Sequence, residues 1–141
     1  EMLRSLVGSE MCIRDRDNVT KLRINNRAVF RKSNLFEKVR EEEKFDMIIS
    51  NPPYIPADYE FEPEVLHEPK LALIAEENGL EFYRKITEQA PEFLKPDGIL
   101  MFELGIGEAE LVKAFMEKDF EDIKIEKDLA GIERIIYGKK L

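Results

Sequence analysis

A short apolar run that ends at two prolines constrains the fold of this chain more than any other feature. Residues 45–50 read Phe-Asp-Met-Ile-Ile-Ser and are rich in residues that favour strands. Their mostly apolar character predicts a strand buried on both faces, as in a parallel sheet. Pro52 and Pro53 then end the strand, because a proline nitrogen cannot donate a hydrogen bond to a neighbouring strand. Ser50 and Asn51 are therefore expected at the carboxyl end of a strand, where open α/β sheets bind their ligands.

The sequence Asn-Pro-Pro-Tyr at 51–54 offers hydrogen-bond acceptors in a rigid frame. The side-chain oxygen of Asn51 and the backbone carbonyls of Asn51 and Pro52 have few donors competing for them. Such a cluster suits a planar NH2 group, which brings two donors, and the Tyr54 ring can stack on the flat group that carries it. Holding both hydrogens would aim an amide or amino nitrogen at an electrophilic methyl group without a general base. The alternative is a plain strand end, with Asn51 as a turn residue.

Residues 46–56, Asp-Met-Ile-Ile-Ser-Asn-Pro-Pro-Tyr-Ile-Pro, resemble the signature of the protein-(glutamine-N5) methyltransferases that modify peptide-chain release factors, the PrmC/HemK family. Asn-Pro-Pro-Tyr alone is shared with adenine-N6 and guanine-N2 methyltransferases, so it indicates a reaction type and not a substrate. Three further stretches are similar to family motifs: Val65–Leu73, Asn78–Ile86 and Asp128–Arg134. The joint match covers roughly Asn26 to the C-terminus.

The resemblance implies an α/β fold, namely part of a Rossmann-like class I methyltransferase that uses S-adenosyl-L-methionine. It also implies a reaction, the transfer of a methyl group to the side-chain amide of a glutamine in a release factor. By this resemblance Asn51 and Pro52 are the catalytic residues. The residues implied to bind the substrate are Asn51, Pro52, Pro53, Tyr54, Glu68 and Pro69. The alternatives are a nucleic-acid amino methyltransferase and a fragment without catalytic activity.

Asn34 and Leu35 are the further residues that the resemblance places beside the cofactor, together with Asn51. They follow a predicted strand at 28–32, where the family carries Gly-Asp-Leu-Phe with its acidic residue near the adenine. Asn34 replaces that acidic residue, and its side-chain oxygen could accept from the adenine amino group without a charge. The equally weighted alternative is that Ser33 and Asn34 cap a following turn.

The remaining pattern predicts the C-terminal half of a parallel sheet that ends in an antiparallel hairpin. We expect helices at 78–94, ended or kinked by Pro91, and at 108–118, with Leu111, Val112 and Phe115 inward. We expect strands at 99–102, after a turn at 96–98, and at 122–127 and 134–137. The resemblance implies the strand order 3-2-1-4-5-7-6 with strands 1 and 2 missing. The strand at 28–32 would then have no neighbour, and the exposed sheet edge could drive association.

Residues 1–17 match nothing in the family, and we interpret them as an atypical, spurious segment before a partial catalytic domain at 18–141. A natural leader or a short helix is the alternative. No Gly-x-Gly-x-x-Gly turn follows a strand, so we expect most of the cofactor site to be missing and the piece to be inactive alone. The intact parent would be the enzyme.

The composition of the chain limits the kinds of partner and site that it can have. The net charge of −8, with acids and bases interspersed, weighs against a nucleic-acid partner, which usually meets a basic surface. A protein substrate is easier to accept. A single cysteine, Cys12, excludes an intrachain disulfide and a multi-cysteine metal site, and we expect no metal. We expect no membrane span and a cytoplasmic location. His67, the only histidine, is interpreted as a loop residue and not as a base.

Overall fold

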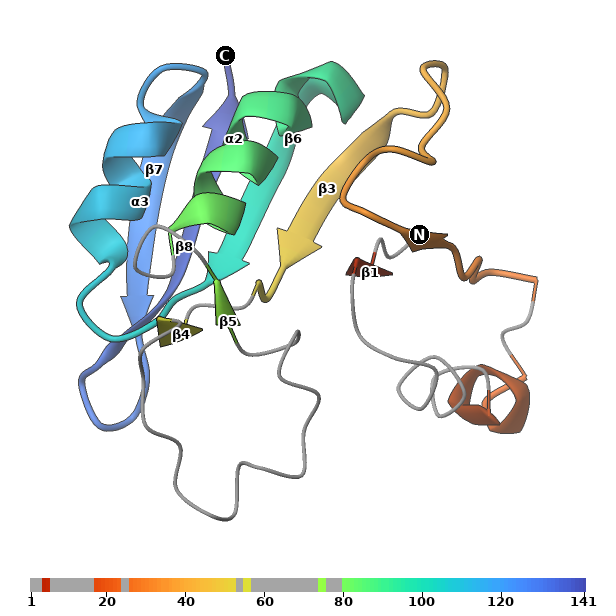
Figure 1. The fold of residues 1–141 in the computed structure, drawn as a ribbon, viewed down its shortest axis with the longest axis horizontal. Helices are drawn as coiled ribbons and strands as arrows, with labels where there is room; N and C mark the ends of the chain where they lie inside the picture. The colour runs from red at the N-terminus through yellow and green to blue at the C-terminus, as the bar shows by residue number, and fades with distance from the viewer. Residues whose placement is uncertain (1–3, 6–16, 24–25, 53–54, 57–73, 76–79) are drawn as a thin grey trace.

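A computed structural model describes residues 4–5, 17–23, 26–52, 55–56, 74–75 and 80–141 of the chain (Figure 1). Its elements are, in chain order, β1 (Arg4–Ser5), β2 (Lys32–Ser33), β3 (Phe45–Ser50), β4 (Ile55–Pro56), β5 (Ile74–Ala75), α2 (Glu81–Phe93), β6 (Leu94–Glu103), α3 (Ala109–Met116), β7 (Phe120–Lys127) and β8 (Glu133–Lys140). A helical segment at 17–21 precedes β2. From β3 onward the longer strands alternate with helices until two strands end the chain, with the short strands β4 and β5 between β3 and α2; this is the predicted α/β pattern.

The four long strands form one mixed sheet in the order β3-β6-β8-β7. β3 and β6 run parallel, while β8 is antiparallel to both β6 and β7. The last two strands are therefore a hairpin whose second strand inserts beside β6. This confirms the predicted terminal hairpin and reproduces the final four positions, 4-5-7-6, of the order that the resemblance implied.

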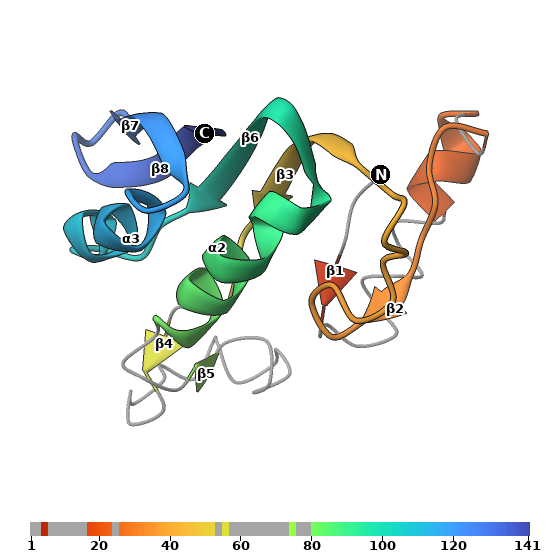
Figure 2. The same ribbon diagram turned by 90° about the horizontal axis from the view of Figure 1, so that it is seen from above.

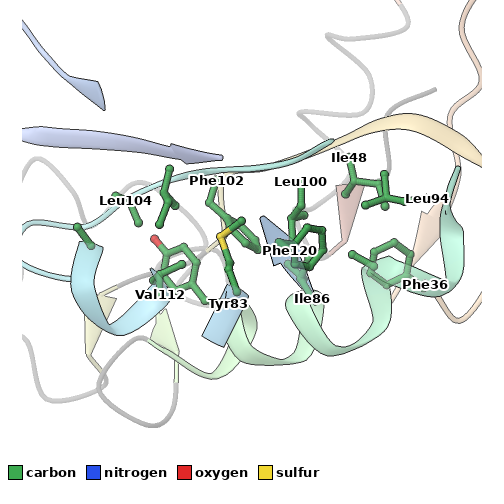
Figure 3. Packing of buried hydrophobic residues seen from close by; sticks show 14 of the residues in the cluster. Phe36, Ile48, Tyr83, Ile86, Leu94, Leu100, Phe102, Leu104, Val112 and Phe120 are labelled. Atoms are coloured by element: carbon green, nitrogen blue, oxygen red, sulfur yellow. The ribbon is translucent and has the colours of Figure 1, made fainter. Parts of the chain in front are cut away.

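Both helices cover the same face of this sheet, as Figures 1 and 2 show. Leu100, Phe102 and Ile136 point into that layer and are fully buried. Burial of each such side chain contributes about 1.5–3 kcal/mol of transfer free energy. From α2, the Tyr83 ring meets the Phe102 ring edge-on, with 5.2 Å between centroids, and Ile86 lies below Leu100 (Figure 3). The core therefore forms between the sheet and the two helices.

The opposite face of the sheet is open among the described residues. Met47 and Ile49 of β3 are 40% and 57% exposed, and Ile135 of β8 is 38% exposed, whereas Ile48 is buried. The prediction that this strand is buried on both faces is therefore wrong for the described part of the chain. The alternation follows from the pleat, because successive side chains of a strand point to opposite faces and only one face has helices packed on it.

One predicted turn is replaced by a strand, because pairing between distant strands overrides a local signal. Residues 96–98 were expected to form a turn before a strand, but they lie inside β6 as an irregularity. Phe45 pairs with Leu94 and Met47 with Ile99, so β6 carries extra residues between the two pairs, and Asp97 adopts φ +61°. The predicted helix at 78–94 is observed as α2, which runs two residues past Pro91.

Further expectations are corrected at α3 and at β2. On α3, Leu111 is 52% exposed, while Val112 is buried and Phe115 is half-buried, so the inward face is rotated from the expected one. The expected strand at 28–32 is only β2, and it does have a neighbour, because it pairs in parallel with β1. The partner is supplied by the segment at 1–17 that the sequence marked as atypical.

Candidate functional site

The carboxyl ends of β3 and β6 place the predicted catalytic residues at one edge of the sheet. Asn51 follows the last residue of β3 directly, its side chain is exposed, and Pro52 after it is buried. A buried proline without an N–H anchors the chain where the strand stops, and the preceding asparagine is left facing solvent. The Asn51 side chain is therefore available to a ligand and is not packed into the core.

Glu103 and Asn51 come directly after a paired position of the two strands. Ser50 of β3 pairs with Phe102 of β6, so Asn51 follows the end of β3 and Glu103 is the last residue of the parallel neighbour β6. Figure 1 shows the arrowheads of β3 and β6 pointing to the same end of the sheet. Open α/β sheets bind their ligands at this end, where the carboxyl ends of the strands lie.

A buried polar network lies directly behind this edge, at the turn between β6 and α3. The Tyr83 hydroxyl donates to the Glu103 carbonyl at 2.8 Å, and the backbone N–H of Gly105 donates to Glu108 Oε2 at 2.9 Å. The same N–H reaches the Tyr83 oxygen at 3.3 Å. Burial raises the pKa of the Glu108 carboxyl, and the hydrogen bonds from Gly105 and Tyr83 oppose that rise. Sequence reasoning missed this network. The one local signal was a glutamate three residues after Gly105, at the start of a helix.

The aspartate–arginine motif of the resemblance ties the final hairpin to the same region. Asp128 accepts hydrogen bonds from the N–H groups of Ala130 at 2.9 Å and Ile132 at 3.0 Å, and from Arg134 Nε at 3.2 Å. These bonds, led by that from Ile132, lower the pKa of Asp128. Arg134 also donates through Nη1 to the Leu104 carbonyl at 3.4 Å, and its own carbonyl accepts from the Leu104 N–H at 2.9 Å. The motif therefore holds the β7–β8 turn against the end of β6.

Asn34 and Leu35 follow β2 in a tight turn. Ser33 Oγ accepts from the Lys38 N–H at 3.0 Å, the Asn34 carbonyl accepts from the Glu37 N–H at 3.1 Å, and Asn34 Nδ2 donates to Glu37 Oε1 at 2.7 Å. Ser33 therefore has the capping role that the alternative gave it, and Asn34 contributes its backbone carbonyl to the turn. The Asn34 amide oxygen is the group that would have to accept from an adenine. Leu35 adopts φ +47°.

The structure does not bring β2 into the four-stranded sheet, because β2 pairs with β1 only. Figure 2 shows this pair beside the sheet and not within it. Asn34 and Asn51 are therefore not at ends of neighbouring strands. The other predicted site residues, Pro53, Tyr54, Glu68 and Pro69, and with them His67, lie outside the described residues.

Two other kinds of site are absent from the described residues. No helix in this part of the chain is long and apolar enough to cross a membrane. Within the same residues, no group of three or more His, Cys, Asp or Glu side chains is arranged to hold a metal ion.

Comparison with known proteins identifies the family. The sequence model of the family described as Eco57I restriction-modification methylase matches residues 8–127. The release factor glutamine methyltransferase of Geobacter sulfurreducens is 49% identical over 109 residues, which are 74% of this chain and 38% of that protein. The protein of the same name from Fusobacterium nucleatum is 44% identical over 116 residues, 79% of this chain and 32% of its own length.

Solved structures agree on the fold. A methyltransferase from Pyrococcus furiosus superposes with a TM-score of 0.63 at 21% identity, over 96% of this chain and 60% of that one. This confirms the predicted Rossmann-like methyltransferase fold. The chain spans 38% and 32% of the two curated relatives named above. It belongs to the methylase family of the matched sequence model, and over most of its length it is similar to the release factor glutamine methyltransferases of these two bacteria.

Proposed function

We propose that this protein takes part in methyl transfer from S-adenosylmethionine to the side-chain amide of a glutamine in a peptide-chain release factor. The observation that carries the proposal is the corner after β3, where the exposed Asn51 precedes the buried Pro52 at the ligand-binding edge of the sheet. The names of the relatives support the choice of substrate. The net charge of −8 also suits a protein substrate better than a nucleic acid.

The chain contributes alignment and electrostatics to this reaction. The Asn51 side-chain oxygen and the Pro52 carbonyl accept the two amide hydrogens and hold the nitrogen with its lone pair directed outward. Acceptors that are in place before the substrate arrives would stabilise the charge that develops on the nitrogen without reorganising. After transfer the nitrogen is strongly acidic, and its proton leaves to water. In the same proposal Tyr54 stacks on the amide and Pro53 stiffens the loop.

S-adenosylmethionine supplies an electrophilic methyl group when it is bound. Asn34, Leu35 and Asn51 are the residues of this chain that would hold it. The geometry at Asn34 fits that role. Its side-chain nitrogen Nδ2 donates to Glu37, which leaves the side-chain oxygen of Asn34 as the acceptor for a ligand. An adenine amino group needs such an acceptor. Glu68 and Pro69 belong to the substrate pocket in this proposal.

Methylation of an amino group in DNA is the second candidate, because the matched family model is named for restriction-modification methylases. One experiment separates the two. Residues 18–141 replace the matching segment of the Geobacter relative, and the chimera is given labelled S-adenosylmethionine with a glutamine peptide or with duplex DNA. The proposal expects label in the peptide only. Label in DNA would favour the second candidate, and label in neither substrate would mean that this chain does not carry the site.

The partial catalytic domain at 18–141, an atypical and spurious segment at 1–17, and a cytoplasmic location are parts of the same proposal. So is association through the edge of the sheet. β7, at one edge, reads Phe-Glu-Asp-Ile-Lys-Ile-Glu-Lys, and charges of this kind discourage pairing with another strand. β3, at the other edge, reads Phe-Asp-Met-Ile-Ile-Ser and has the composition of a central strand. A chain that stays monomeric in sedimentation at high concentration would count against this association.

A further inference from the structure

The network behind the site joins α2, the end of β6 and the start of α3 through a single buried hydroxyl. Tyr83 is fully buried, and its oxygen contacts both the Glu103 carbonyl, at 2.8 Å, and the Gly105 N–H, at 3.3 Å. In Figure 3 this oxygen points from the helix toward the level of the sheet near Leu104. The hydroxyl therefore bridges the two residues that flank Leu104 and fixes the backbone where β6 ends.

Glu108 completes the network from the other side. It is 9% exposed, and its carboxylate accepts from the same Gly105 N–H at 2.9 Å. A Cβ built on Gly105 would lie 2.5 Å from Glu108 Oε2, so the absence of a side chain at this position is what lets the carboxylate approach. A buried carboxylate is costly, and it persists where hydrogen bonds to the charged form offset that cost.

The turn that these groups hold lies next to the candidate catalytic corner. Ser50 pairs with Phe102, and Asn51 and Glu103 follow them at the ends of adjacent strands. The Glu103 backbone therefore lies one residue beyond the last paired position of β3, where a shift would act on the strand end that carries Asn51. A displacement of about 1 Å in a positioned group can cost on the order of a hundredfold in rate.

We propose that Tyr83 is a positioning residue: with Glu108, it fixes the Glu103–Gly105 turn and through that turn sets the orientation of Asn51. This inference rests on the proposed function for its catalytic meaning, but its structural content can be tested without turnover. The groups that act on the Glu108 carboxyl are Tyr83 from α2 and the Gly105 N–H from the turn. Arg134 of β8 donates its side-chain hydrogen bonds to Asp128 and to the Leu104 carbonyl.

The test is a pH titration of the complete 141-residue chain followed by proton–nitrogen NMR. In the wild type, the Gly105 amide and the Asn51 backbone and side-chain amides should titrate together, with one midpoint above the ordinary value for a glutamate. In Glu108→Gln this shared titration should vanish, while the amide oxygen still accepts from Gly105. In Tyr83→Phe the midpoint should rise, and hydrogen exchange at Gly105 should become about fivefold faster, as expected for the loss of one hydrogen bond.

A purely structural role for Tyr83 would lower stability without moving the titration at Asn51. If Gly105 titrates and the Asn51 amides do not, the link to the corner is absent and the inference fails. If neither residue titrates with Glu108, the network itself is refuted. Should Tyr83→Phe not fold, the Glu108→Gln comparison decides alone. Absence of methyl transfer in the chimera would refute the proposed function and leave these outcomes unchanged, so the two failures are distinguishable.

Discussion

Replacing Gly105 with alanine should destabilise the fold, and removing the Glu108 carboxylate should rescue most of that loss. The new Cβ would lie 2.5 Å from Glu108 Oε2 and 2.7 Å from its Cδ, closer than real carbon atoms approach such groups. Relief requires the carboxylate to leave the Gly105 N–H, to which it is bonded at 2.9 Å. Overpacking of this kind costs about 1–3 kcal/mol.

The double variant gives the magnitude of the coupling. Glu108→Ala alone removes one acceptor from the Gly105 N–H, and the Tyr83 oxygen at 3.3 Å remains, so we expect a loss of about 1 kcal/mol. In that background the clash is gone. Gly105 is not among the glycines with positive φ, so alanine there restricts the unfolded chain and is neutral or stabilising by about 0.4–1 kcal/mol. The interaction free energy between the two substitutions should therefore be about 2 kcal/mol in favour of the double variant.

Urea denaturation of the four proteins, followed by circular dichroism, measures this cycle. Gly107→Ala is the matched control, because Gly107 has φ +83° and no atom within 4 Å of a built Cβ. Its cost, about 1–2 kcal/mol from backbone strain, should not change when Glu108 is replaced. Additivity of Gly105→Ala and Glu108→Ala within about 0.5 kcal/mol would refute the claim that the carboxylate occupies the space next to Gly105.

Two further predictions concern the core and the pH dependence of stability. Leu100→Ala, at a fully buried position, should lower the free energy of unfolding by about 2–5 kcal/mol in urea denaturation. Leu111→Ala, at a 52% exposed position, should change it by less than about 0.5 kcal/mol. Equal effects of the two substitutions would contradict the assignment of buried and exposed faces. Glu43 accepts from Arg31 Nη1 at 2.6 Å and from the Arg40 N–H at 2.9 Å, which lowers its pKa from 4.5 to about 2. Its contribution to stability is therefore complete above the unfolded pKa and is lost as the pH falls toward 2, so urea midpoints of Glu43→Gln should fall less between pH 5 and pH 2 than those of the wild type. An identical fall in both proteins would mean that this pair does not act on folding.

Local sequence signals predicted the elements whose ends are set by backbone chemistry. β3 ends where Pro52 removes a donor, and the hairpin of β7 and β8 turns at Gly131, whose φ is +81°. The exposed position of Asn51 follows from the same chemistry. These features depend on residues that are adjacent in the sequence, so a single sequence is enough to predict them.

Features that depend on contacts between distant residues were missed or misplaced. The Pro96-Asp97-Gly98 stretch has the composition of a turn, yet β3 holds it inside a paired strand. The helical pattern of α3 allows either Leu111 or Met116 to face inward, and packing under the sheet buries Met116. The hydrogen bond of Tyr83 to Glu103 joins residues that are 20 positions apart, and no local pattern predicts it.

The measurement that tests the central claim most directly is methyl transfer to a glutamine peptide by the chimera carrying residues 18–141, with and without Asn51→Ala. If the exposed amide at the end of β3 holds the substrate nitrogen, the rate should fall about a hundredfold or more, as for the loss of one preorganised polar contact in a transition state. Asn26→Ala, at another exposed asparagine, should leave the rate unchanged. A rate for Asn51→Ala within twofold of the unsubstituted chimera would contradict the account.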